Sequence, residues 1–293
     1  MKLILSRKGF DSSAGGVPSP IFPDGRLLAL PIPDGQSLIR YRDIAFDGAT
    51  LGDLVAPLTR GKITQDDGAH LDPDLIEAML PRRPGWRPIF GQTGPAQGHL
   101  RNHGVGPGDL FLFFGLFRRV ERLNGTWRWV PDARPRHLIW GWLQVESVVP
   151  VDEARSSDYA WATYHPHFQR PGEPNNVVYL ASRRLRLEGL CEGLGETLPG
   201  AGAFPRFAPQ RQLTAPGATQ TSHWRLPAWC YPEGDRTPLS YHANRQRWRK
   251  HADQVELKAV ARGQEFILDG EEYPEAWPWV RDLIRARTSA SDA

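Results

Sequence analysis

Cysteine is almost absent from this sequence of 293 residues. Cys191 and Cys230 are its only two cysteines, and no CxxC pair occurs. A disulfide framework needs several cysteines, and a cysteine-rich zinc site needs them at close spacing. We therefore expect neither, and no metal ion is predicted from the sequence.

Long apolar runs are absent too. The first nine residues contain only three consecutive apolar residues, Leu3 to Leu5, which is too short a run for a signal peptide. No stretch approaches the length of a membrane span. The sequence predicts a cytoplasmic protein with no membrane partner.

Several familiar catalytic patterns are also missing. The sequence contains no Walker A motif, GxGxxG fingerprint, nucleophile elbow or catalytic triad. It has no internal repeat, low-complexity tract or convincing linker, so residues 1–293 are expected to form one domain. These absences leave both the reaction and the cofactor unknown.

The chain has little excess of charge of either sign, since its formal net charge is only +3. Positive charge is concentrated between residues 240 and 262, where six Arg or Lys and two Asp or Glu give a local net charge of +4. A helix is predicted from Ser240 to about Ala252. Its basic side chains suit a phosphate backbone, although a solvated helix face is the commoner reason for such a stripe. The candidates for backbone contact are Arg245, Arg247, Arg249 and Lys250.

What the sequence does contain is a clear β-meander within residues 104–149. The apolar run at 110–117 predicts a strand buried on both faces. Asn124-Gly125 then predicts a two-residue type I′ hairpin turn, because both positions need positive φ. This turn sets Val120 opposite Trp129, and residues 137–149 return as the third strand.

The remaining composition favours a sheet with long loops, since the chain has 29 Gly, 27 Pro and 11 Trp. The predicted fold class is α+β, with a curved mixed or antiparallel β-sheet or a partly open barrel, flanking helices and long ordered loops. Further strands are expected at 2–6, 177–181 and 265–269. Helices are expected at 51–58, at about 72–80 with Asp72 as N-cap and Pro73 in the first turn, and at 274–287. Residues 84–103 are expected to form an ordered surface loop.

The loop after the first strand is one candidate site. Arg7 and Lys8 supply positive charge, Asp11 and Ser12 offer polar groups, and three glycines let the backbone approach a ligand. A solvated loop whose glycines allow tight turns is the competing interpretation.

Histidine and aspartate supply the second candidate. His70, Asp72 and Asp74 lie within five residues. Their imidazole and two carboxylates could hold a divalent ion or act as acid and base. Asp72 is equally explained as a helix cap. His165 and His167 could complete such a site from a distant segment, or simply occupy a turn.

Polar and aromatic segments are the remaining candidates. Gln92, His99 and Asn102 could read the edge of a base, and Asn175 lies in another polar loop. Tryptophans such as Trp140 and Trp142 could stack bases but are more often core residues. If the protein has a ligand site, the loops at 7–16, 70–74, 92–103 and 165–176 should converge on it.

These landmarks resemble those of one family, the nucleotide-modification-associated domain 3 family, over nearly the whole chain. The motifs that carry the resemblance are Ser6-Arg-Lys-Gly-Phe-Asp-Ser-Ser-Ala-Gly-Gly-Val-Pro-Ser-Pro20, Leu30-Pro-Ile-Pro-Asp34, His70-Leu-Asp-Pro-Asp-Leu75, Phe90-Gly-Gln, Gly108-Asp-Leu-Phe-Leu-Phe-Phe-Gly115, Gly141-Trp-Leu-Gln-Val145 and Gly263-Gln-Glu-Phe266. The resemblance implies a place in bacterial or phage systems that modify bases in DNA, with other base-modification proteins as partners. Residues 104–149 are also similar to the barrels of PUA, ASCH and EVE-like domains, which read modified or flipped bases.

Three functions follow as hypotheses. The first is a component of a base-modification system that binds a nucleotide or a modified base, with DNA the favoured polymer. The second is an enzyme that acts on a nucleotide or base through Asp11, His70 or Asp72. The third is an interaction protein without a ligand pocket.

Overall fold

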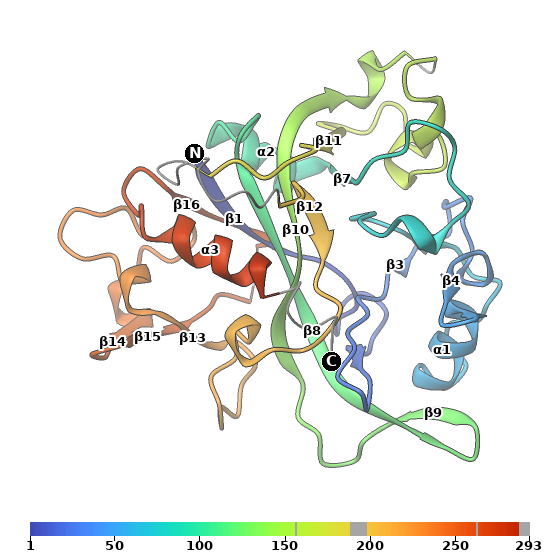
Figure 1. The fold of residues 1–293 in the computed structure, drawn as a ribbon, viewed down its shortest axis with the longest axis horizontal. Coiled ribbons are helices and arrows are strands. Elements are labelled where there is room, and N and C mark those ends of the chain that lie inside the picture. Colours follow the sequence, from blue (N-terminus) through green and yellow to red (C-terminus); the bar gives the residue numbers. More distant parts are fainter. Residues whose placement is uncertain (156, 188–197, 262, 287–293) are drawn as a thin grey trace.

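A long, curved, mixed β-sheet forms the centre of the molecule (Figure 1). The computed structural model describes residues 1–155, 157–187, 198–261 and 263–286. The sheet has nine strands, and six of them follow the order β16-β1-β8-β10-β11-β7. The six are β16 (Glu265–Asp269), β1 (Lys2–Arg7), β8 (Leu110–Leu123), β10 (Arg136–Pro150), β11 (Val177–Ala181) and β7 (Ile89–Gln92). Three short strands attach to this path: β2 (Ser19–Ile21) and β9 (Thr126–Trp129) to β8, and β12 (Ala201–Ala203) to β10.

The predicted meander is confirmed. Strand β8 is buried throughout its first six residues, as its apolar sequence requires. It pairs antiparallel with β9, and Val120 lies opposite Trp129 in the register that the turn predicts. Asn124 and Gly125 have φ values of 50° and 82°, which is the conformation of a type I′ turn. Strand β10 then returns antiparallel to β8.

This turn allows a direct test. Gly125→Ala should lower the free energy of unfolding by about 1 kcal/mol, because an L side chain is disfavoured at positive φ even where space is open. Denaturant unfolding would measure the change. Gly106→Ala is the matched control, since Gly106 also has open space around a Cβ but a negative φ. Equal unfolding midpoints for both variants would contradict the assignment of the turn.

The pleat of β1 separates two hydrophobic cores. Leu3 and Leu5 point to one face of the sheet, and Ile4 points to the other. The first face is covered by helix α3 (Ala276–Arg285) and by a three-stranded sheet (Figure 1). That sheet has the order β13-β15-β14, with β13 (His223–Pro227), β15 (Gln254–Lys258) and β14 (Trp248–Lys250).

The second face is concave and filled by aromatic rings. Phe90 of β7 contacts Phe111 and Phe113 of β8 and stacks on Tyr179 of β11, with ring centroids 5.1–5.6 Å apart. Helix α2 (Gly94–Asn102) follows β7 and packs against β16. The sheet therefore curls until its two edge strands approach each other.

Side chains, not backbone pairing, join these two edges. Gln92 Nε2 on β7 donates a hydrogen bond of 2.6 Å to Glu265 Oε1 on β16. No barrel closes among the described strands, because β7 and β16 share no ladder. The α+β fold with a curved mixed sheet is confirmed.

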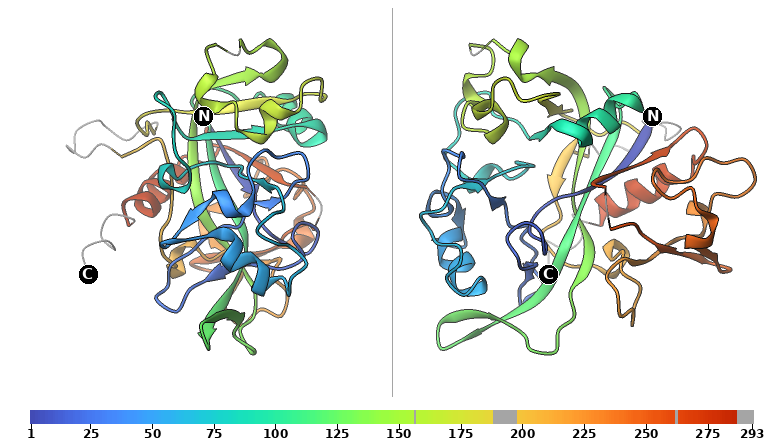
Figure 2. Two further views of the ribbon diagram at one scale, coloured as in Figure 1. Left: turned by 90° about the vertical axis from the view of Figure 1, so that its right-hand side faces the viewer. Right: turned by 180° about the vertical axis from the view of Figure 1, so that it is seen from behind.

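Residues between β2 and β7 form a layer of small elements beside the meander (Figure 2). Helix α1 (Leu51–Leu58) begins with a reciprocal capping box between Thr50 and Asp53 and buries an apolar face. Two strand pairs lie nearby: β3 (Ile32–Pro33) with β6 (Ala69–His70), and β4 (Ala45–Phe46) with β5 (Ala49–Thr50). The chain also has short 3₁₀ turns, at Tyr41–Asp43, Glu77–Met79, Val151–Glu153, Ala160–Ala162, Pro166–Gln169, Pro209–Arg211, Ala228–Cys230 and Arg245–Arg247. Among the described residues, none of the helices has both the length and the apolar character needed to span a bilayer.

The helix predicted to begin at Asp72 is wrong. Asp74 is extended and exchanges two backbone hydrogen bonds with Ile89 of β7, and only a 3₁₀ turn at Glu77–Met79 follows. The Asp72 carboxylate accepts from the distant backbone N–H of Gly91 rather than from a helix N-terminus. A contact from outside the segment overrode the local capping signal.

The helix predicted from Ser240 to Ala252 is also wrong. The segment forms a 3₁₀ turn and then strand β14, which pairs with β15. In this strand Trp248 is buried and Arg249 and Lys250 are exposed. The predicted surface loop at 84–103 is wrong as well, because it contains β7 and α2. Pro95 at the start of α2 was the overlooked signal.

Candidate functional site

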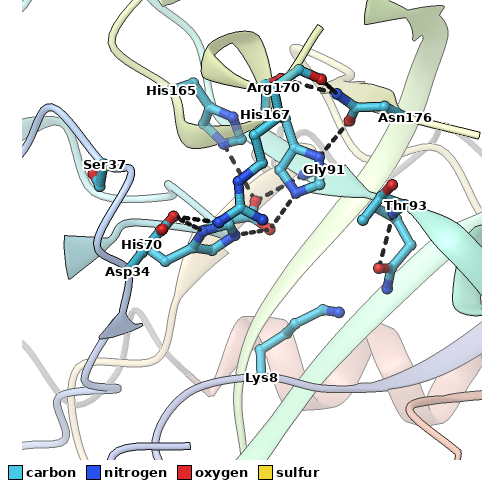
Figure 3. A network of polar contacts seen from close by, with 12 residues as sticks. Lys8, Asp34, Ser37, His70, Gly91, Thr93, His165, His167, Arg170 and Asn176 are labelled. Atoms are coloured by element: carbon cyan, nitrogen blue, oxygen red, sulfur yellow. Dashed lines mark hydrogen bonds and ion pairs between the residues drawn. The ribbon is translucent and has the colours of Figure 1, made fainter. Parts of the chain in front are cut away.

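The carboxylate of Asp72, whose side chain is only 4% exposed, is the centre of a cluster of polar side chains. His70 and Asp72 come from the end of β6 and the segment after it, and Gly91 comes from β7. His165 and His167 lie in the long connection between β10 and β11. Figure 3 shows the rings of His70, His165 and His167 turned toward one another.

The two oxygens of Asp72 have different surroundings. Oδ1 accepts a hydrogen bond of 2.7 Å from Gly91 N–H and lies 3.2 Å from His165 Nε2. Oδ2 faces His167 Nε2 at 3.7 Å and His70 Nε2 at 3.8 Å. Burial alone raises the pKa of Asp72, but the contact with His165 and the nearby rings of His167 and His70 lower it to about 2. Asp72 is therefore a carboxylate at neutral pH.

The tautomer of His70 is fixed from outside the cluster. Its Nδ1 lies 2.9 Å from Asp34 Oδ2, which also pairs with Arg170 Nη2 at 2.8 Å. The contact with His70 and the positive charge of Arg170 hold the pKa of Asp34 well below its usual range, against the effect of burial. An ionised Asp34 only accepts hydrogen bonds, so His70 Nδ1 carries the proton.

The tautomer of His167 is fixed in the same way. Its Nδ1 lies 2.6 Å from Asn176 Oδ1. Asn176 Nδ2 donates to the carbonyls of His167 and Arg170 at 2.9 and 3.0 Å, so the amide orientation is determined and Oδ1 must accept. The proton therefore lies on Nδ1. Burial lowers the pKa of His167 to about 4, which leaves the ring neutral and its Nε2 lone pair toward Asp72.

His165 is completely buried, yet its ring is poorly satisfied. Among the described residues, Nε2 contacts only Asp72 Oδ1, and Nδ1 has no hydrogen-bond partner. A buried polar group without partners costs about 1–3 kcal/mol. Stability alone does not account for an imidazole here, so His165 is a candidate for a functional role.

A second network joins the two segments that carry the cluster. Arg82 makes two hydrogen bonds to the buried Asp74, of 2.6 and 2.8 Å. Tyr164 donates to Asp74 Oδ2 at 2.5 Å and accepts from Trp86 Nε1 at 2.8 Å. Asp74 and Tyr164 stand close in sequence to Asp72 and His165, so this network holds the two segments together.

Another polar group lies where the edges of the sheet meet. Lys8 Nζ forms an ion pair of 3.0 Å with Glu265 Oε1, which also accepts from Gln92. Lys8 lies over the ring of Phe90, on the concave face. Figure 3 shows Lys8 beneath the histidine cluster.

The structure separates several residues that the sequence grouped. Arg7 points to the opposite face from Lys8, over Phe114, because adjacent residues of a strand alternate. Asp11 Oδ1 accepts three hydrogen bonds from Ser13 and Ala14 in its own loop, and Ser12 is exposed.

Residues on and near α2 also have other contacts. His99 Nε2 lies 3.1 Å from Ser240 Oγ, and Asn102 is exposed at the end of α2. Asn175 accepts from Arg101 at 2.7 Å, next to Asn176 of the cluster. Of the four predicted loops, 70–74 and 165–176 thus meet directly at Asp72, whereas 7–16 and 92–103 approach through Lys8 and Gln92.

The predicted backbone-binding residues line one edge of the small sheet. Arg245 and Arg247 donate to the carbonyls of Gly234 and Lys258, and Lys250 pairs with Glu233 at 2.8 Å. Arg249 faces Glu256 across the β14–β15 ladder. Their role in binding stays a prediction.

Sequence reasoning missed four residues of the site: Asp34, Gly91, Arg170 and Asn176. The role of Asp34 becomes visible only through its contact with His70. Gly91 has a clearer signal, since a glycine inside a buried strand often marks a close approach. A Cβ at Gly91 would collide with the ring of His167.

The fold and this cluster define the class: an α+β protein with a buried histidine–aspartate site beside a curled mixed sheet. The chain belongs to the family described as nucleotide modification associated domain 3, whose family model matches residues 2–269. The family's name associates it with nucleotide modification. No curated protein and no solved structure matches the chain.

Proposed function

We propose that this protein binds a nucleotide or a nucleobase of DNA at the Asp72 cluster and acts on it as part of a base-modification system. One observation carries the proposal. Segments far apart in the sequence deliver a carboxylate and three imidazoles to one buried point. The family's association with nucleotide modification supplies the substrate class.

The chemistry of the cluster suits an enzyme better than a purely structural core. Asp72 is ionised and His167 is neutral, so the site presents a negative charge and an imidazole that can accept a proton. His165 adds a ring whose Nδ1 is unpaired. Lys8 and Gln92 both bond to Glu265 Oε1, and an ammonium group and an amide are groups that suit the edge of a base.

Asp72→Asn should weaken nucleotide binding at least tenfold and abolish any conversion. The variant keeps the shape of the side chain but removes its charge and replaces one acceptor with an amide group. Binding would be measured with the deoxynucleoside triphosphates and with labelled single- and double-stranded oligonucleotides, and products by nucleoside mass spectrometry. Asp132→Asn, at an exposed acid in a turn, is the matched control.

Three outcomes separate the functions. Binding and conversion that both depend on Asp72 support the proposal. Binding that depends on Asp72 without any conversion makes the protein a reader of bases rather than an enzyme. Equal binding by the Asp72 and Asp132 variants excludes this cluster as the site.

A further inference from the structure

We propose that His70, Asp72 and His167 bind one divalent first-row transition-metal ion. Their candidate ligand atoms all lie within 4.8 Å of one another. The inference deepens the proposed function by naming a cofactor for the same site, and it rests on that function only for the role of the ion. The scarcity of cysteine predicted no metal, although the sequence analysis named His70, Asp72, His165 and His167 as residues that could hold a divalent ion.

The strongest argument is the direction in which the three candidate ligand atoms point, namely Nε2 of His70, Nε2 of His167 and Oδ2 of Asp72. Asp34 and Asn176 accept hydrogen bonds from Nδ1 of His70 and His167, so Nε2 is the atom that each ring turns toward Asp72 Oδ2. In the described part of the chain, none of these three atoms makes a hydrogen bond. Two ring nitrogens and a carboxylate oxygen thus converge, an arrangement that a cation between them would stabilise.

The partners around these ligands match those of known metal sites. A histidine ligand usually donates its other N–H to a carboxylate or carbonyl oxygen, which fixes the ring. His70 does so to Asp34, and His167 does so to the Asn176 amide oxygen. Asp72 is itself oriented by Gly91 N–H and by His165, both at Oδ1. Oδ2 is thereby left for the ion.

The distances among the three ligand atoms allow a small ion to bind once the ligands draw closer together. Metal–ligand bonds of about 2.0–2.1 Å place tetrahedral ligands about 3.4 Å apart. The Nε2 atoms of His167 and His70 lie 3.7 and 3.8 Å from Asp72 Oδ2, a few tenths of an ångström beyond this spacing. All three ligand atoms lie within 4.8 Å of one another, so metal binding would also draw the two rings together.

The ligand types narrow the choice of ion. Two imidazoles and one carboxylate suit Zn²⁺, Fe²⁺ or Mn²⁺, whereas Mg²⁺ and Ca²⁺ prefer oxygen ligands throughout. Three protein ligands leave at least one coordination position open for water or substrate. His165 lies next to these ligands, with its Nε2 3.2 Å from Asp72 Oδ1.

The test uses the purified full chain, stripped with chelator and titrated separately with Zn²⁺, Mn²⁺, Mg²⁺ and, without oxygen, Fe²⁺. Bound metal is counted by elemental analysis, and Co²⁺ substitution reports the coordination geometry by its absorption spectrum. We expect one equivalent of transition metal. His167→Gln and Asp72→Asn should each weaken its affinity by roughly 100-fold or more, and Asn176→Leu by about 10–100-fold.

A second histidine pair supplies the control. His99 in α2 and His103 just after it have ring centroids 4.2 Å apart and could bind metal adventitiously. A His99→Gln/His103→Gln variant should retain the metal. Circular dichroism and thermal melts identify any variant that fails to fold, and the Co²⁺ spectrum of the parent needs no variant.

The result can overturn this inference without touching the proposed function. Absence of stoichiometric metal in the parent, or metal lost only with His99 and His103, would refute the metal site. Nucleotide binding by metal-free protein would then leave the function standing. Metal bound at Asp72 without any nucleotide binding would instead support the metal site and contradict the proposed function.

Discussion

Replacing Arg82 with methionine is expected to lower the free energy of unfolding by about 3–5 kcal/mol. Arg82 is the bidentate partner of Asp74, whose side chain is completely buried. Removing the guanidinium leaves a carboxylate in the protein interior without its countercharge. Tyr164 still donates to Asp74, but a single hydroxyl does not replace a cation.

Urea unfolding of the parent and the variant would measure this change. Arg83→Met is the matched control, because Arg83 is the next residue, is exposed and makes one hydrogen bond, to the Ala160 carbonyl. It should cost less than about 1 kcal/mol. Adding Asp74→Asn to Arg82→Met should recover part of the loss, since the unpaired charge is then gone. Similar losses for the Arg82 and Arg83 variants would contradict the argument.

The same substitution should also disturb the candidate site. Asp74 follows Asp72 by two residues, and Tyr164 immediately precedes His165. The network around Arg82 therefore fixes the distance between two of the segments that form the cluster. Weaker metal binding by Arg82→Met than by Arg83→Met, in protein that is still folded, is the expected result.

The sequence was most informative where neighbours along the chain decide the structure. Asn124-Gly125 specifies its turn locally, and the register of Val120 against Trp129 follows from it. The apolar strands at 177–181 and 265–269 were predicted with their observed bounds for the same reason. At Asp72 the local signal pointed to a helix cap, and a hydrogen bond from Gly91 decided otherwise.

The site was only partly predictable because its contacts are long-range. The candidates included His70, Asp72, His165 and His167. Sequence spacing does not show, however, that β6 and the connection before β11 lie side by side in the fold. Asp34 and Asn176 could not be assigned at all, because their role is to orient other side chains. Arg7 and Lys8 show the reverse case: neighbours in the sequence that the strand pleat sends to opposite faces.

A test of Lys8 has to separate its predicted role in ligand binding from its contribution to the stability of the fold. Its ion pair with Glu265 is buried, with side-chain exposures of 10% for Lys8 and 1% for Glu265. Lys8→Met should therefore destabilise the fold by about 3 kcal/mol, because the Glu265 carboxylate keeps only the hydrogen bond from Gln92. A loss of ligand binding in this variant alone would not distinguish a binding role from a damaged core.

The double variant Lys8→Met/Glu265→Gln separates the two roles. Removing both charges should restore most of the stability, because neither group is left unpaired. Thermal melts would show this recovery, with Lys62→Met as the control at an exposed lysine. If Lys8 contacts the phosphate of a nucleotide, the stable double variant should still bind weakly, and its deficit against the parent should shrink as salt rises. Binding by the double variant equal to that of the parent would confine Lys8 to joining the edges of the sheet.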